Sequence, residues 1–380
     1  MTIDWQRVHE QFPINRRLTW LNNCGISTMP GPVLARLQAH LQAMAEGGVT
    51  GVPSETAVHD SVRARLSRLI GADQDELTLI HHTTEGLTFI SHGLDLAPGD
   101  RLVLLEHEYP SNVYPWQHWQ GRGVQLAFAP LADTPEQFLE GLRPLLQPPT
   151  RVVSLSAVHW CTGLPLPLVE IGKLCAERDV LLVVDGAQGV GLVDLDVRAA
   201  GIGAMAFSAW KWLLGPIGLG AMYLRRDLID RLRFPFKGAG SVIDDHNHLP
   251  YRDALKPGAD RYVLSTPNYN DWVHFDASLE YLEGLGFAAV RGRIRTLAAR
   301  LSDLLRAAGW SLASDAFPAQ ASGIVSAAWP GLDAPKLVTR LQQDGVVGAA
   351  RLGRLRLAPH VYISEEQLDR AVSLIVAQAA

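Results

Sequence analysis

Three short polar motifs follow apolar runs in the sequence, and their residue types could support chemistry on a small ligand. Thr83 and Thr84 follow the first run, Asp185 ends a later one, and Lys211 comes shortly after the next. Ligands of open α/β sheets bind at the carboxyl ends of the strands, where such motifs would meet. Their order along the chain therefore predicts one shared site.

Lys211 has surroundings that suit covalent chemistry with a carbonyl compound. It lies among Trp210, Trp212, Leu213 and Leu214, and apolar surroundings favour the neutral form of a lysine. A neutral amine is what Schiff-base formation requires. For this motif alone, the commoner explanation is a lysine whose stem passes the tryptophans and whose ammonium group stays in water.

Asp185 and the two threonines each allow two interpretations. A carboxylate at the end of a buried strand needs a cationic partner, because an unpaired buried charge is costly, but this residue could also cap a helix or lie in a surface turn. Thr83 and Thr84 open a predicted helix whose free N–H groups could bind a phosphate, or they could simply cap it. The three motifs together are more specific than any one of them.

Seven short apolar runs between residues 77 and 224 determine the predicted fold class. Several are continuous and not alternating, which is typical of strands buried on both faces of a mainly parallel sheet. Helical patterns separate most of them, so we expect an α/β fold in which helices sandwich a mainly parallel seven-stranded sheet. The runs are 77–81, 101–105, 124–127, 151–156, 180–185, 204–208 and 219–224.

The pattern changes after about residue 260, where helical stretches and short strand-like pieces predict a smaller α+β domain. A last helix begins near Ser364, whose spacing to Gln367 is typical of a capping box. We therefore predict a large domain over residues 16–260 and a small domain formed by residues 1–15 with 261–380. The helical stretches and strand-like pieces lie at 271–285, 288–308, 323–328 and 354–357.

Residues 237–261 are rich in glycine, proline, aspartate and histidine and predict a long loop, and long loops in compact domains are often functional. We interpret the two histidines within residues 244–248 as solvated polar residues and predict no metal site. Residues 201–206 match the dinucleotide pattern G-x-G-x-x-A, but they precede a strand instead of following one, which disfavours a nicotinamide dehydrogenase. A non-catalytic binding module on the same scaffold is the other alternative.

The composition excludes several classes of protein. A chain of 380 residues with 47% hydrophobic and 19% charged residues suits two packed globular domains. The net charge of −5 gives no sign of nucleic-acid binding, and no run approaches the ~18 apolar residues of a membrane span. A start without a signal-peptide pattern and three unpaired cysteines predict a cytoplasmic protein. These are Cys24, Cys161 and Cys175.

The motifs resemble those of the aminotransferase class V family, the fold-type I enzymes of pyridoxal 5′-phosphate (PLP). This family includes cysteine desulfurases, selenocysteine lyase, kynureninase and isopenicillin N epimerase. The resemblance covers nearly the whole chain, from residues 21–25 (LNNCG) to residues 355–362 (LRLAPHVY). It implies PLP as the cofactor, Lys211 as its Schiff-base lysine and Asp185 as the partner of its ring nitrogen.

The resemblance also implies the remaining contacts of the cofactor and of a small amino-acid substrate. Arg356 would bind the substrate α-carboxylate through its bidentate fork, with Asn23 as a second substrate contact. Thr266 would reach the phosphate in the neighbouring subunit, so a homodimer with shared active sites is expected. The implied cofactor contacts are Thr83, Thr84, Tyr109, His159, Asp185, Gln188, Ser208, Trp210, Lys211 and Thr266.

The identity of the residue that stacks on the cofactor ring is open between two positions. Aligned on residues 112–116 (NVYPW), the stacking position falls on Tyr109, which joins Lys211 and Asp185 as a catalytic residue. His107 takes this place if the loop carries an insertion. His159 could approach the ring hydroxyl, or it could be a half-buried histidine whose hydrogen bonds are satisfied elsewhere.

One departure from the family affects the predicted reaction. Desulfurases carry a nucleophilic cysteine shortly before the carboxylate-binding arginine, whereas residues 344–356 contain none. A persulfide on that loop is therefore not expected. The main prediction is transamination at the α-carbon of a small amino acid. The alternative is a lyase, by C–S or other β-elimination, or an epimerase, in either case without a persulfide cysteine.

Overall fold

The structure is a computed structural model that describes residues 3–317 and 322–379. Its largest sheet has the strand order β2-β8-β7-β6-β5-β3-β4. Neighbouring strands from β4 to β7 pair in parallel, and β8 runs antiparallel to both of its neighbours. The predicted mainly parallel seven-stranded sheet is therefore confirmed. Its strands are β2 (Leu77–Ile80), β3 (Arg101–Leu105), β4 (Gln125–Ala129), β5 (Thr150–Ser156), β6 (Leu181–Asp185), β7 (Ala204–Ser208) and β8 (Gly220–Leu224).

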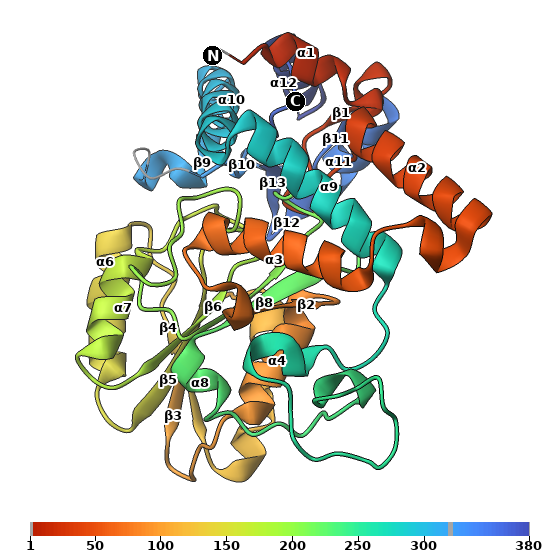
Figure 1. Ribbon diagram of the computed structural model, residues 1–380. Coiled ribbons are helices and arrows are strands. Elements are labelled where there is room, and N and C mark those ends of the chain that lie inside the picture. Colours follow the sequence, from red (N-terminus) through yellow and green to blue (C-terminus); the bar gives the residue numbers. More distant parts are fainter. Residues whose placement is uncertain (1–2, 318–321, 380) are drawn as a thin grey trace.

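Both faces of this sheet are buried under helices (Figure 1). In β6, Leu182 and Val184 belong to one apolar core, whereas Val183 belongs to a second core. Because successive side chains of a strand point to opposite faces, a core on each face explains the continuous apolar runs. The α-helices just before, between and just after these strands in the chain are α3 (Glu55–Ile70), α4 (Thr83–Gly93), α5 (Tyr114–Gln117), α6 (Pro135–Leu142), α7 (Leu168–Ala176) and α8 (Arg226–Ile229).

A smaller antiparallel sheet has the order β12-β13-β10-β9. Its strands are β9 (Ser311–Leu312), β10 (Val325–Ala328), β12 (Ala349–Arg351) and β13 (Arg354–Leu357). The remaining helices are α1 (Trp5–Glu10), α2 (Gly31–Gly47), α9 (Tyr269–Leu285), α10 (Phe287–Ala307), α11 (Ala334–Gln343) and α12 (Glu365–Ala379). The smaller α+β part is thus confirmed, while the division of the chain at residues 16 and 260 stays a prediction.

An N-terminal segment joins this smaller part and leads toward the site. Strand β1 (Thr19–Trp20) pairs in parallel with β11 (Val346–Val347). The backbone oxygen of Leu21 then accepts a hydrogen bond from Ala358 at 2.6 Å, and a further bridge joins Asn22 to Ala358. Because Ala358 directly follows β13, these pairings bring the next residues of the segment to the end of that strand.

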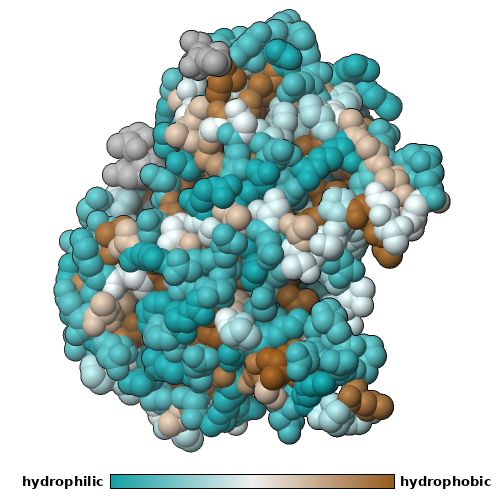
Figure 2. Space-filling model, in the orientation of Figure 1, coloured by the Kyte–Doolittle hydropathy of each residue, from teal (hydrophilic) through white to brown (hydrophobic). Residues whose placement is uncertain are grey.

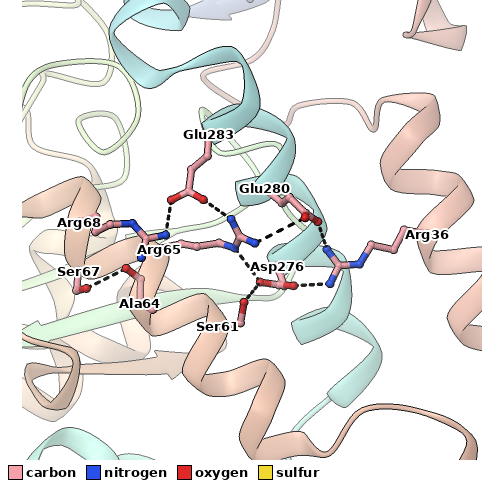
Figure 3. A network of polar contacts seen from close by, with 9 residues as sticks. All are labelled: Arg36, Ser61, Ala64, Arg65, Ser67, Arg68, Asp276, Glu280 and Glu283. Atoms are coloured by element: carbon pink, nitrogen blue, oxygen red, sulfur yellow. Dashed lines mark hydrogen bonds and ion pairs between the residues drawn. The ribbon is translucent and has the colours of Figure 1, made fainter.

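Helix α9 is fastened to α2 and α3 by arginines and carboxylates (Figure 3). Asp276 of α9 is buried and accepts hydrogen bonds from Arg36 of α2 and from Ser61 and Arg65 of α3. Arg65 also pairs with Glu283, which lies further along α9. A buried carboxylate without partners would be strongly destabilising. The network that satisfies Asp276 therefore holds α9 against both α2 and α3.

Two further predictions from the sequence agree with the structure. Residues 237–261 contain no α-helix or strand, as expected for the long loop, although short 3-10 helices occupy Ala239–Ser241 and Gly258–Tyr262. At the start of α12 the backbone N–H of Gln367 donates to Ser364 Oγ at 3.1 Å, and that of Ser364 donates to Gln367 Oε1 at 3.3 Å, which is the predicted capping box.

The face shown in Figure 2 is mostly hydrophilic, with apolar residues scattered over it. In the described residues, no helix has the length and apolar character needed to cross a membrane.

Candidate active site

Most residues predicted for the site line one cavity of about 180 Å³. It lies where β6 and β7 end with Asp185 and Ser208, and where α4 begins at Thr83 soon after β2. Because β6 and β7 share one carboxyl edge, motifs far apart in the sequence meet there. The predicted residues in the lining are Thr83, Thr84, Tyr109, Asp185, Gln188, Ser208, Trp210, Lys211 and Arg356.

Lys211 and Asp185 determine much of the electrostatics of this cavity. Burial raises the pKa of Asp185, although the charge of Lys211 opposes the shift. Burial likewise lowers the pKa of Lys211, against the charge of Asp185. Asp185 also accepts a hydrogen bond from the backbone N–H of Ala187 at 2.9 Å. The lysine therefore loses its proton more readily than a lysine in water, as a nucleophilic amine must.

One part of the cavity offers donors for an anion. Thr83 and Thr84 are the first residues of α4, and the first N–H groups of a helix lack partners within the helix. The buried hydroxyl of Ser208 has no hydrogen-bond partner among the described residues, while Thr84 Oγ1 donates to Ser111 Oγ at 2.8 Å. A helix start beside an unpartnered hydroxyl suits a phosphate group.

Arg356 supplies a buried guanidinium at another part of the lining. One of its Nη groups donates to the backbone oxygen of Trp160 at 2.7 Å, and the guanidinium lies 5.9 Å from the centre of the Trp160 ring. Its Nε is buried without a hydrogen-bond partner in the described part of the chain. An unsatisfied buried donor is costly. A carboxylate bound here would accept the hydrogen bond for which this Nε has no partner.

The structure separates the two candidates for ring stacking. Tyr109 lines the cavity, and the centre of its ring lies 5.7 Å from Lys211 Nζ. His107 lies outside it, and its backbone oxygen accepts hydrogen bonds from Trp160 Nε1 at 2.8 Å and His159 Nε2 at 3.1 Å. His159 is itself outside the lining, with Nδ1 bonded to Thr162 Oγ1 at 2.9 Å. Both of its ring nitrogens are engaged, and burial lowers its pKa to about 4.

Asn23 and Thr266 also lie outside this cavity. Asn23 is buried, donates to the backbone oxygen of Ala358 at 2.8 Å and accepts from the Tyr362 hydroxyl at 2.7 Å. Asn23 therefore holds in place the segment beside the cavity, and it does not line the cavity itself. Thr266 lines a different cavity of about 410 Å³, together with Lys256. The roles given to His159, Asn23 and Thr266 stay predictions.

Several lining residues were not expected from the sequence. Cys24 is buried in the lining, and burial raises its pKa against the charges of Arg356, Lys211 and Arg351. It belongs to the LNNCG motif, so its neighbourhood carried a signal although its own role was not predicted. The others come from loops and a hairpin, where no periodicity points to a site. They are Gly25, His82, Ser111, Trp160, Ala187 and Arg351.

Glu108 directly precedes Tyr109, the residue predicted to stack on the cofactor ring, and was also missed. Its carboxylate accepts hydrogen bonds from the backbone N–H groups of Tyr109 at 2.7 Å and Ser156 at 2.8 Å, from Ser156 Oγ at 2.6 Å and from Asn112 at 3.3 Å. Ser156 is the β5 residue paired with Asp185 of β6. Burial and the nearby Asp185 raise the pKa of Glu108 to about 7. Glu108 thus fixes the Tyr109 loop to the strand ends that form the cavity.

These features fit PLP with an amino acid attached. The start of α4 and Ser208 suit its phosphate, Asp185 suits a protonated ring nitrogen, Lys211 suits its aldehyde, and Arg356 suits the amino-acid carboxylate. The phosphate would satisfy the unpartnered Ser208 hydroxyl, and the amino-acid carboxylate would satisfy the unpartnered Nε of Arg356. The cofactor would also supply Asp185 with the cation that a buried carboxylate requires.

The chain belongs to the aminotransferase class V family, whose family model matches residues 19–361. It is therefore a PLP-dependent enzyme of this class, as the sequence motifs implied. A cysteine desulfurase from Klebsiella pneumoniae is 28% identical over 86% of this chain and 83% of its own length. Isopenicillin N epimerase from Amycolatopsis lactamdurans is also 28% identical, over 96% of both chains.

A solved structure supports the fold over nearly the whole chain. The complex of a cystine C–S lyase with its reaction product cysteine persulfide superposes with a TM-score of 0.89. The match covers 96% of this chain and 99% of that chain at 24% sequence identity. At this level of identity the likeness establishes the shared fold, and the reaction has to be argued from the site.

Proposed function

We propose that this enzyme is a lyase that eliminates a β-substituent from an amino acid. The observation that carries the proposal is the single cavity in which the amine of Lys211, the carboxylate of Asp185 and the guanidinium of Arg356 meet. Relatives named cysteine desulfurase support a lyase more than the transaminase expected at first. The cystine C–S lyase of the same fold points in the same direction.

The side chains can divide the work of such an elimination. When bound, PLP supplies an aldehyde for the substrate amine and a ring that withdraws electrons from Cα. Arg356 would hold the α-carboxylate and so orient the Cα–H bond toward Lys211. The free amine of Lys211 would take the proton from Cα as a general base. Asp185 would keep the ring nitrogen protonated throughout.

This reaction does not require a persulfide on the protein. The proton that Lys211 removes from Cα can be returned to the β-substituent as it leaves with the bonding electrons. Residues 344–356 form β11, β12 and β13 with their connecting turns, and they contain no cysteine. Cys24, in contrast, lines the cavity. Trapping a persulfide on Cys24 during turnover of cysteine would contradict this part of the proposal.

Product analysis distinguishes the three reactions that this site could perform. The holoenzyme is incubated with cysteine, cystine and β-chloroalanine, and separately with alanine and a 2-oxo acid. Elimination predicts pyruvate and ammonia from the first three without any added 2-oxo acid. A new amino acid formed from the 2-oxo acid would instead establish transamination.

The epimerase relative that spans 96% of both chains makes racemisation the second candidate. Deuterium incorporation at Cα, together with the D-isomer and without pyruvate, would favour it over elimination. The same incubations in deuterated water report this outcome, so one experiment decides between all three reactions.

We further propose that Thr266 completes the site of a second copy of the chain. It lies in a different cavity from Lys211 in its own chain, which suits a residue that acts across a two-fold interface. Thr266→Ala should then weaken PLP binding by about tenfold, the loss of one hydrogen bond to a charged group. It should also loosen the dimer, because PLP would bridge both chains.

Sedimentation of holoprotein and apoprotein across a dilution series checks this proposal, with Ser265→Ala as the neighbouring control. Ser265 lines the same cavity and is expected to leave both PLP binding and the dimer unchanged. A fully active monomer that retains PLP would show that one chain builds the whole site.

A further inference from the structure

A second hollow of about 480 Å³ adjoins the cavity that holds Lys211. Tyr109, Trp160 and Arg351 line both spaces, so they form the border between them. The rings of Tyr109 and Trp160 meet edge to face at 5.6 Å, and the side chain of Leu352 is exposed on the far side. An amino acid held at Lys211 would therefore direct a long side chain past Arg351.

The geometry of a hairpin places Arg351 and Arg356 on the same side. Ala349 of β12 pairs with Arg356 of β13 in the antiparallel register. Arg351 follows Ala349 by two residues and therefore points to the same face. Such diagonal neighbours lie roughly 7–8 Å apart between Cα atoms. Two guanidinium groups thus belong to one binding site, one deep and one near its border.

Both arginines keep the capacity to bind anions. The hydrogen bonds that they form go to backbone oxygens, from Arg351 to Ala350 at 2.7 Å and from Arg356 to Trp160 at 2.7 Å. Neither pairs with a carboxylate in residues 3–317 and 322–379, although Arg306 and Arg300, elsewhere on the surface, do. The α-carboxylate of a substrate would occupy only one of these two arginines. The guanidinium of the other would have no anionic partner if the substrate side chain were small and neutral.

We infer that Arg351 binds a second anionic group at the end of the substrate side chain. The substrate class is then an amino acid with a distal carboxylate, its chain passing alongside the contacting rings of Tyr109 and Trp160 toward Arg351. This inference rests on the proposed function only in assigning the α-carboxylate to Arg356. Because Arg351 is exposed, its contribution should weaken as salt is added.

Pairs of acids and their amides test the inference, because each pair differs only in the charge of the distal group. Binding of glutamate and glutamine to the holoenzyme is followed by calorimetry and by the change in PLP absorbance. The shorter pair, aspartate and asparagine, and the longer 2-aminoadipate show which length of substrate side chain fits the site. We expect the acid to bind about tenfold tighter than its amide in the best pair, as for one charge-assisted hydrogen bond.

Arg351→Gln should remove this preference by weakening binding of the acid about tenfold, with less than a twofold change for the amide. Arg354→Gln is the matched control. Arg354 lies on the same hairpin, but its Nε donates to Ser326 Oγ at 3.1 Å and it lines another cavity. The preference for the acid should therefore survive in that variant.

The outcomes separate this inference from the proposed function. If Arg351→Gln weakens acids and amides equally, Arg351 serves the α-carboxylate and the inference is wrong. Equal affinity of the wild type for acids and amides would also overturn it, while the proposed elimination could stand. If no amino acid binds to the holoenzyme at all, the proposed function fails together with the inference.

Discussion

At the scale of single residues, the site has one buried carboxylate, Asp185, beside the amine of Lys211, and a second, Glu108, near Asp185. Asp185 and Glu108 are both less than a tenth exposed, and Asp185 raises the cost of charging Glu108. Lys211 offsets part of that cost for Asp185. A protonated ring nitrogen beside Asp185 would offset more, because it adds a positive charge next to this buried carboxylate. The side chains thus favour binding of a cationic ring before any reaction begins.

Glu108 should make the stability of the apoprotein depend on pH. Its pKa is about 7 in the folded protein and 4.5 in an exposed chain. A raised carboxyl pKa favours the folded state below pH 4.5, and this advantage is lost as the pH rises through 7. The contribution of Glu108 to the free energy of unfolding should therefore fall by up to about 1.4 kcal/mol per pH unit in that range.

Denaturant unfolding of the wild type and of Glu108→Gln at several pH values measures this effect as a difference in slope. Glu106→Gln, at an exposed position two residues earlier, is the control and should keep the wild-type slope. An identical slope for wild type and Glu108→Gln would show that Glu108 is already charged at low pH.

At the scale of elements, the close approach of α4 to β7 depends on one glycine. A Cβ atom at Gly86 would lie 2.7 Å from the Cβ of Ala206 and 2.7 Å from Ile80 Cδ1. Gly86→Ala should therefore push the start of α4 away from the strand that ends at Ser208. We expect a loss of about 1–3 kcal/mol in stability, as for other overpacked cores, and weaker binding of PLP.

Thermal unfolding and a PLP titration check the effect of Gly86→Ala, and Gly292→Ala provides the control. A Cβ atom at Gly292, in α10, would meet no atom of another element within 4 Å, so alanine there should stabilise the helix by up to about 1 kcal/mol. Unchanged stability and PLP affinity for Gly86→Ala would mean that the start of α4 does not set the phosphate site.

The elements that the sequence predicted are those with a clear period or a continuous apolar run. The helical stretches at 271–285 and 288–308 correspond to α9 (Tyr269–Leu285) and α10 (Phe287–Ala307). Burial on both faces hides the direction of a strand, so the antiparallel course of β8 could not be predicted. Strands of two or three residues, such as β9, β11 and β12, are too short to show a period.

The same physical limit applies to the site. Asp185, Ser208 and Lys211 could be predicted because they follow buried strands that share one edge. Cys24 could not, since it reaches the cavity through pairings between segments that are more than 300 residues apart, such as the bridge from Asn22 to Ala358. Such pairings depend on the packed fold and leave no local pattern.

At the scale of the whole molecule, buried histidines should limit stability in acid. Burial lowers the pKa of four of them to about 4, namely His59, His159, His274 and His360. A lowered histidine pKa gives stability that is present above pH 6.5 and is lost as the pH falls toward 4. Each of these histidines should lower the free energy of unfolding by up to about 1.4 kcal/mol per pH unit as the pH falls in this range. The four together outweigh the opposite contribution of Glu108.

Unfolding free energies between pH 7.5 and 4.5 test this account, with His360→Asn flattening the profile and His246→Asn leaving it unchanged. His360 is fully buried, whereas His246 is exposed. A stability that stays constant down to pH 5 would contradict the neutral, buried state of these histidines.

The central claim is that Lys211 binds PLP in the cavity beside Asp185, and reduction with borohydride tests it most directly. Reduction fixes the cofactor to its lysine, and mass spectrometry of tryptic peptides then locates it. Because trypsin does not cut after a modified lysine, we expect the pyridoxyl group on the uncut peptide 199–225, which contains Lys211. Asp185→Ala should keep this label, since the bond to the cofactor forms at Lys211. A label on Lys173, Lys237, Lys256 or Lys336, or no label in a protein that contains PLP, would contradict the claim.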